Sequence, residues 1–255
     1  MTRLTTIVPF LAFGLLVSMA QADTNLINIA GSQRMLTQRM MKNYALLGMG
    51  IRYGDVKSKL QNSITQFDNN LNQLDAATAN SKANQPLQQV KGQWQPIRKV
   101  LLDSPNKEQA TKLHEQLDRL MASSQEVVNA LTQQNATAQG DIVSLAGRQR
   151  MLSQRMAALY ALSAWRINDF DFMSKFRSTV ESFRQAHNRL IASKLTTPAI
   201  RKALEGAEKS FRWFEFSAKK RSDKFIPSLI LRASDDILMK MEEATRLYAI
   251  GSRKP

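Results

Sequence analysis

A segment of this chain occurs twice. Residues 27–40 return as residues 143–156 without a gap, and both copies contain the pattern Ala-Gly-x-Gln-Arg-Met-Leu-x-Gln-Arg-Met. Equivalent residues, such as Gly31 and Gly147, are 116 positions apart. An internal repeat at a fixed spacing defines the structural unit that a chain duplicates. The sequence therefore predicts two similar halves.

The first 22 residues have the pattern of a secretory signal peptide. An apolar stretch at residues 7–19 follows a short basic start, and Ala20-Gln21-Ala22 matches an A-x-A cleavage site. Cleavage there would leave a mature chain that begins at Asp23 and lies in the periplasm. The alternative is an uncleaved anchor, although the apolar stretch is shorter than the roughly 20 residues that span a bilayer. The chain has no cysteine, so its folding requires no disulfide in that compartment.

The balance of charge restricts the class of partner. The formal net charge is +15 at pH 7. Such an excess of Lys and Arg would first suggest binding to nucleic acid. Export argues against that interpretation, because outside the cytoplasm positive charge meets anionic envelope surfaces or attracts small anions. We therefore expect no nucleic-acid partner.

Each half contains about four helical segments, since apolar residues recur at helical spacing and turn signals fall between them. In the first half we expect a helix over residues 24–53, a second helix capped by Asp55, a third that contains Pro96, and a fourth that begins at Pro105. The second half repeats this plan, with its third helix opened by Pro198. No run of β-branched residues at period two indicates a strand.

The predicted fold class is all-α, with two tandem antiparallel four-helix bundles. Residues 1–22 would be the signal peptide, residues 23–138 the first repeat and residues 139–255 the second. Between Leu120 and Trp165 the chain has no proline, so the last helix of the first repeat can continue into the next. Two arrangements stay open: repeats that pack side by side, and repeats joined end to end by a long central helix.

On a helical wheel the repeated motif has two apolar faces. One carries large residues such as Leu36, Met40 and Leu152 and should lie in the core of its own bundle. The other, the small-residue face, consists of Ile27, Ala30, Gly31, Arg34, Gln38, Met41, Ala45 and Gly48 in the first copy and Val143, Ala146, Gly147, Arg150, Gln154, Ala157, Ala161 and Ala164 in the second. Small residues allow another helix to approach closely. The remaining side, with Arg39, Lys42 and Arg155, is expected to face solvent.

The arginines of the small-residue faces, Arg34 and Arg150, require a negative partner. A buried cation without one costs several kcal/mol, and neither face has Asp or Glu within a helical turn. If the two faces pack together, two guanidinium groups and two glutamine amides converge, and a planar oxyanion bound between them removes the repulsion. The alternative is that each arginine extends to solvent or pairs with a carboxylate of a distant helix, such as Asp68, Glu115 or Glu181.

The residues of the motif also carry a resemblance to known families. The Ala-Gly-x-x-Arg-Met core of both copies resembles the P-box helix of periplasmic nitrate/nitrite-sensing domains in bacterial sensor histidine kinases. The fuller pattern is similar to the N-terminal domain of type IV pili methyl-accepting chemotaxis transducers. The resemblance covers the whole mature chain as two four-helix sensor modules.

The resemblance implies a binding site and a role for each of its residues. In the nitrate sensors the P-box arginines of two subunits meet at the dimer axis and hold one anion. Arg34 and Arg150 would take that role here, with Gly31 and Gly147 allowing close approach. Gln38 and Gln154 complete the predicted ligand-binding set.

The predicted function is therefore non-enzymatic. We expect a periplasmic module that binds a small anion, nitrate or nitrite, and reports its presence to a membrane sensor or transporter protein. The alternative is an envelope adaptor, linked to type IV pili or chemotaxis signalling, that binds no ligand. No cofactor is expected. No metal is expected either, because neither of the two histidines, His114 and His187, has a second His or a Cys to complete a zinc set.

Overall fold

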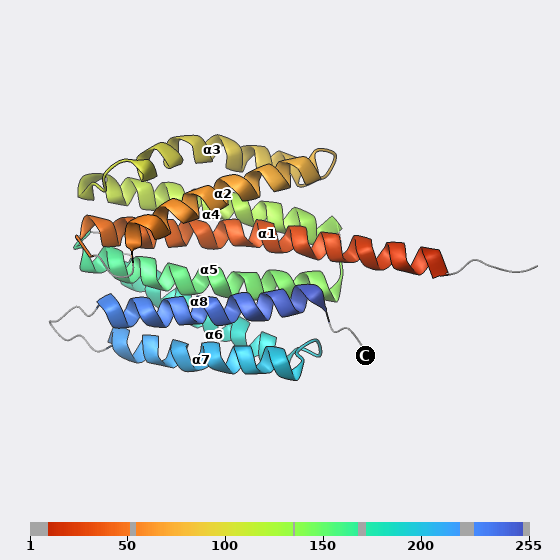
Figure 1. Ribbon diagram of the computed structural model, residues 1–255. Helices are drawn as coiled ribbons and strands as arrows, with labels where there is room; N and C mark the ends of the chain where they lie inside the picture. Colours follow the sequence, from red (N-terminus) through yellow and green to blue (C-terminus); the bar gives the residue numbers. More distant parts are fainter. Residues whose placement is uncertain (1–9, 52–54, 135, 168–171, 220–226, 252–255) are drawn as a thin grey trace, which may run out of the picture.

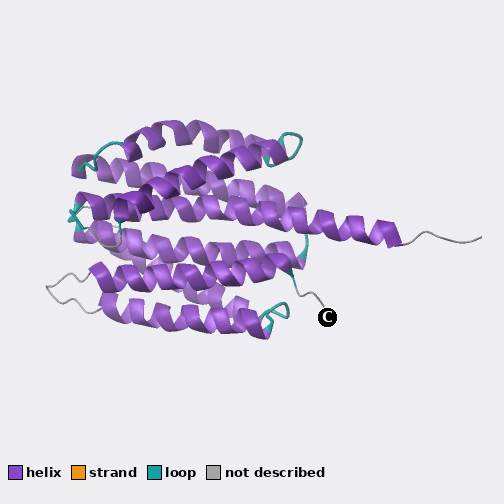
Figure 2. Cartoon of the chain, in the orientation of Figure 1, coloured by secondary structure: helices purple, strands orange, loops and turns teal. Residues whose placement is uncertain are grey.

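The computed structural model describes residues 10–51, 55–134, 136–167, 172–219 and 227–251. Within these ranges every regular element is an α-helix (Figure 2). The first repeat contains α1 (Phe10–Gly48), α2 (Val56–Thr78), α3 (Asn84–Leu102) and α4 (Lys107–Gln134). The second repeat contains α5 (Ala138–Ala164), α6 (Phe172–Ala192), α7 (Pro198–Lys219) and α8 (Pro227–Ile250). The predicted all-α fold is confirmed.

The two groups of four helices lie side by side (Figure 1). Helices α1 and α5, which carry the repeated motif, occupy the centre and run in the same direction. Helices α2, α3 and α4 lie on the outer side of α1, and α6, α7 and α8 lie on the outer side of α5. Two further contacts cross the boundary, because α1 also touches α8 and α5 also touches α4.

The end-to-end arrangement is excluded by the connection between the repeats. Helix α4 ends at Gln134, and α5 begins at Ala138 and runs back beside α1. Thr137 caps the new helix, since its Oγ1 accepts a hydrogen bond from the backbone N–H of Gly140 at 3.0 Å. A threonine at this position satisfies one of the free N–H groups of the first turn. The absence of proline therefore does not lead to a continuous helix.

The ends of several helices differ from the sequence predictions. Helix α1 begins at Phe10, inside the predicted signal peptide, whose first nine residues lie outside the described part of the chain. It ends at Gly48, because the next glycine, Gly50, has φ of 71° and turns the chain. Asp55 caps α2 as predicted and accepts a hydrogen bond from the N–H of Ser58.

Three prolines have different effects. Pro105 does not begin α4, because the side chain of Asn106 accepts a hydrogen bond from the N–H of Glu108 and the helix starts at Lys107. Pro96 lies inside α3, which continues past it to Leu102. Pro198 opens α7 as predicted, with Thr197 as the residue before it. Fixed φ and a missing N–H suit proline to the first helical turn.

Each bundle has its own apolar core, and the two cores meet between α1 and α5. The large face of the motif is buried as predicted: Leu36, Met40 and Leu152 are almost fully shielded from solvent. Within each bundle, a pair of aromatic rings packs together away from the boundary between α1 and α5. The rings of Phe67 and Trp94 lie 4.2 Å apart between centroids in the first repeat. Those of Phe183 and Phe211 lie 4.4 Å apart in the second.

Candidate functional site

The small-residue faces of α1 and α5 pack against each other along the centre of the molecule. The helices approach closely at Gly31 and Gly147, because a Cβ atom added to Gly147 would lie 4.0 Å from the Cα of Gly31. Their neighbours on these faces are buried as well, among them Ile27, Ala30, Val143 and Ala146. The predicted seam between helices is therefore present, and it joins the two repeats.

Arg34 and Arg150 converge over this pair of glycines. An added Cβ at Gly147 would lie 3.2 Å from Nη2 of Arg34 and 3.4 Å from Nη2 of Arg150. At Gly31 the corresponding distances would be 3.2 and 3.7 Å. Both guanidinium groups thus occupy the volume that a larger residue would need. Glycine at these two positions provides space for the arginines as well as for the close helix approach.

The hydrogen bonds of the two arginines follow the internal symmetry of the chain. Nη2 of Arg34 donates to the backbone carbonyl of Ser144 at 3.2 Å. Nη2 of Arg150 donates to the equivalent carbonyl, that of Asn28, at 3.5 Å and to its side-chain Oδ1 at 2.7 Å. Each arginine therefore reaches across to the motif helix of the other repeat. Arg34 has one more partner, since its Nη1 donates to Oε1 of Gln125 on α4.

The electrostatics of the pair are unfavourable. Arg34 is 1% exposed and Arg150 is 6% exposed, and neither forms an ion pair with a carboxylate among the described residues. Burial, with the nearby charges of Arg150 and Arg148, lowers the pKa of Arg34 to about 9. Burial lowers the pKa of Arg150 to about 10, and the negative charge of Glu242 on α8 partly opposes this. In both side chains the buried Nε–H has no acceptor among the residues described.

The carboxylates considered as alternative partners are engaged elsewhere. Asp68 accepts hydrogen bonds from Trp94 and Arg98 within the first repeat. Glu115 forms an ion pair with Arg119 one turn along its own helix. Glu181 accepts a hydrogen bond from Gln185. The arginines also do not extend to solvent, because both are buried. None of these three carboxylates therefore pairs with either arginine, and Glu242 on α8 acts on Arg150 only through its charge.

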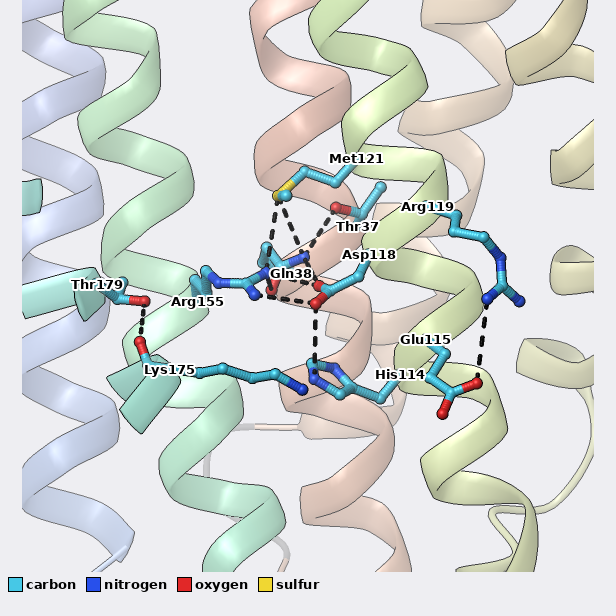
Figure 3. A network of polar contacts seen from close by, with 10 residues as sticks. All are labelled: Thr37, Gln38, His114, Glu115, Asp118, Arg119, Met121, Arg155, Lys175 and Thr179. Atoms are coloured by element: carbon cyan, nitrogen blue, oxygen red, sulfur yellow. Dashed lines mark hydrogen bonds and ion pairs between the residues drawn. The ribbon is translucent and has the colours of Figure 1, made fainter. Parts of the chain in front are cut away.

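The two predicted glutamines are buried one turn beyond the arginines but point to other groups. Nε2 of Gln38 donates to Oδ1 of Asp118 at 3.2 Å (Figure 3). Nε2 of Gln154 donates to the backbone carbonyl of Ser234 at 3.3 Å. No hydrogen bond between either glutamine and Arg34 or Arg150 occurs among the described residues. The structure therefore brings the predicted arginines and glycines together, whereas the amides lie beside them.

The remaining side of the motif helices, with Arg39, Lys42 and Arg155, is predicted to face solvent. This prediction is wrong for two of these three cations. Lys42 is 2% exposed, and its Nζ lies 2.7 Å from Oδ1 of Asp235 on α8. Arg155 forms two hydrogen bonds to Asp118 on α4, at 2.6 and 2.9 Å (Figure 3). The physical reason is that α4 and α8 cover this side with acidic residues, which a wheel of one helix does not reveal. Arg39 is partly exposed.

Another residue that is identical in the two copies of the motif forms contacts within its own bundle. Gln33 donates through Nε2 to the carbonyl of Phe67, and Gln149 donates to that of Phe183 in the equivalent place. These bonds fix α1 to α2 and α5 to α6. Sequence reasoning overlooked Asn28, Gln125 and Glu242 near the arginines. Only Asn28 carried a signal, because a polar residue, Asn or Ser, occupies this place in both copies.

The described residues contain no group of three or more His, Cys, Asp and Glu side chains that could hold a metal ion. His114 and His187 are both buried, at 1% and 4% exposed, and belong to different repeats. His187 stacks against Phe183 with 5.9 Å between ring centroids, and burial lowers its pKa. None of the helices in the described ranges has an apolar stretch long enough to cross a membrane.

A comparison with known protein families finds a match to the chain. The family model described as "Type IV pili methyl-accepting chemotaxis transducer N-term" matches residues 15–120 and 130–212, which is most of the chain and includes both copies of the motif. No curated protein and no solved structure matches the chain.

Proposed function

Because the chain belongs to the family of type IV pili methyl-accepting chemotaxis transducer N-terminal domains, we propose that it is a sensing module for a small oxyanion. The ligand, nitrate or nitrite by preference, binds between Arg34 and Arg150. The module acts in the periplasm after export and reports the presence of the anion to a membrane sensor or transporter protein. It carries out no catalysis. The family accounts for the sensing role, and the arginine pair accounts for the choice of ligand.

The observation that carries this proposal is the convergence of two buried guanidinium groups. Their Nη2 atoms lie over the same two glycines, and among the described residues no carboxylate forms an ion pair with either side chain. Two like charges at this depth repel each other strongly, because the surrounding dielectric is low. A single monovalent oxyanion would convert that repulsion into two attractions. A planar ion offers acceptors that match the planar donors of both arginines.

The position of the pair favours a sensing role over simple storage of an anion. Arg34 belongs to the first repeat and Arg150 to the second, and each is already hydrogen-bonded to the motif helix of the other repeat. An anion held by both side chains therefore contacts the two bundles at once. Its arrival or departure changes the free energy of packing between them. A membrane partner that contacts both bundles could detect this change.

One observation favours the second candidate, an adaptor that binds no ligand. Gln125 and Asn28 already accept hydrogen bonds from the two guanidinium groups. In that case the arginines serve only as polar contacts between the repeats. Type IV pilus or chemotaxis proteins of the envelope would then be the partners. The two candidates differ in whether the purified chain binds an anion.

Isothermal titration of the mature protein with nitrate, nitrite, chloride and sulfate separates these candidates. We expect the planar anions to bind, and Arg34→Ala or Arg150→Ala to weaken binding by about 1.5–3 kcal/mol, the contribution of hydrogen bonds to charged groups. Arg39→Ala is the control on the same helix and should change the affinity little. If millimolar nitrate and nitrite release no heat with the parent protein, or if the control loses as much affinity as the others, the adaptor is the better explanation.

A further inference from the structure

Two acidic residues connect the repeats in a crossed pattern. Asp118 lies on α4 of the first repeat and pairs with Arg155 on α5 of the second, at 2.6 Å. Asp235 lies on α8 of the second repeat and pairs with Lys42 on α1 of the first, at 2.7 Å. In both cases the fourth helix of one repeat supplies the carboxylate and the motif helix of the other repeat supplies the cation. Each repeat therefore supplies one carboxylate and one cation.

These pairs are more constrained than ordinary surface ion pairs. The side chain of Lys42 is 3% exposed and that of Arg155 is 14% exposed. Asp118 receives two hydrogen bonds from Arg155 and a third from Nε2 of Gln38 on α1, so three helices meet at one carboxylate (Figure 3). Lys59 on α2 also approaches Asp235, at 3.1 Å. Charge-assisted bonds with two parallel contacts fix orientation as well as distance.

The crossed pairs lie next to the arginine pair along the same seam. Arg155 follows Arg150 by five residues, which corresponds to roughly 7 Å along a helix at 1.5 Å per residue. Lys42 follows Arg34 by eight residues, or roughly 12 Å. Beside Gly31 and Gly147 the seam brings together two positive charges that repel, although each arginine also donates hydrogen bonds across the seam. The crossed pairs supply attractive charges that join the two bundles along this seam.

We propose that Asp118 and Asp235 are positioning residues for the anion site. They hold α1 and α5 at the separation and register at which Arg34 and Arg150 converge, against the repulsion of the two guanidinium groups. The carboxylates do not contact the anion. They act on it only through the packing of the repeats. This inference rests on the proposed function for its effect on affinity, but its effect on packing does not depend on any ligand.

The test combines a distance measurement with a titration. The chain has no cysteine, so spin labels can be placed at exposed positions by Gln89→Cys on α3 and Lys202→Cys on α7. In the protein that also carries Asp118→Asn and Asp235→Asn, we expect the distribution of distances between the labels to broaden or shift. Nitrate affinity, measured without labels, should fall by about tenfold, within the usual range for coupling between separate sites. Circular dichroism confirms that the variants are folded.

Controls distinguish positioning from a general loss of charge. Asp75→Asn removes a carboxylate whose partner, Lys91, belongs to the same repeat, and should leave both readouts unchanged. Asp118→Glu keeps the charge and should retain most of the nitrate affinity that Asp118→Asn loses. If the double asparagine variant does not fold, Arg155→Lys takes its place. It keeps the charge but loses the paired hydrogen bonds, and should give smaller changes in the same direction.

The outcomes are separable. Unchanged distances in the asparagine variant overturn the inference, whatever happens to nitrate binding. Changed distances with parental nitrate affinity also overturn it, because the site would then not depend on the crossed pairs. If the parent protein binds no nitrate, the proposed function fails, and the distances alone decide whether Asp118 and Asp235 set the packing of the repeats.

Discussion

Replacement of Arg34 by methionine should stabilise the ligand-free protein while it weakens anion binding. Arg34 is 1% exposed, and burial together with the nearby charges of Arg150 and Arg148 lowers its pKa to about 9. Since each pKa unit corresponds to about 1.4 kcal/mol, burial and these two charges together cost the charged side chain about 5 kcal/mol. Its hydrogen bonds to Gln125 and Ser144 return about 3 kcal/mol, at the lower end of the range for bonds to charged groups. Methionine fills much of the same volume without the charge. The free energy of unfolding should therefore rise by about 2 kcal/mol, as for other buried charges replaced by apolar residues.

Urea denaturation followed by circular dichroism at pH 7, in buffer without nitrate or nitrite, measures this change. Titration with nitrate on the same samples should show binding weakened by about 1.5–3 kcal/mol. Arg98→Met is a matched control, because Arg98 is partly exposed and pairs with Asp68 within one repeat. It should lose a little stability and bind nitrate as the parent does. If Arg34→Met unfolds about 2 kcal/mol more easily than the parent, the contacts of the arginine outweigh the cost of its burial. The reasoning from an uncompensated charge would then be refuted.

Three substitutions and one pH series test other parts of the account. Gly147→Ala places a Cβ 3.2 Å from Nη2 of Arg34 and 3.4 Å from Nη2 of Arg150, so titration should show weaker nitrate binding. Gly92→Ala, where the space is open, should instead raise the free energy of unfolding by about 0.5–1 kcal/mol. Between about pH 9 and 12 the unfolded chain keeps the proton of Arg34 that the folded protein releases, so stability rises with pH. The stability gained by Arg34→Met should consequently shrink in urea denaturation as the pH rises above about 9. Thr137→Ala removes the cap of α5. It should lower the free energy of unfolding, measured by urea denaturation, by about 1 kcal/mol.

Much of the arginine site could be predicted because its cause is local. The spacing of Gly31 and Arg34 places both residues on one face of a helix, and the repeat places Gly147 and Arg150 in the same way. A face of small residues has to pack against a helix, so two equivalent faces in one chain are natural partners. Helix starts at Asp55 and Pro198 were predictable for the same reason, since capping depends on neighbouring residues.

The surroundings of the site could not be predicted because they come from distant segments. A helical wheel assigns Lys42 and Arg155 to a polar side, but it does not say which helix covers that side. Their partners, Asp235 and Asp118, lie on the fourth helix of the opposite repeat, so the pairing depends on how the bundles pack. The direction of Gln38 depends on packing within the first repeat, because its amide donates to Asp118 on α4. The arrangement of the repeats itself was open until the break between α4 and α5 was known.

The number of anions that one chain binds tests the central claim most directly. Equilibrium dialysis of the mature protein against isotope-labelled nitrate, at protein concentrations above the dissociation constant, gives this number. A site shared by Arg34 and Arg150 predicts one nitrate per chain, lost when either arginine is replaced. Two nitrates per chain would mean that each repeat binds its own ion. That result, or no bound nitrate at all, would contradict a single site between the repeats.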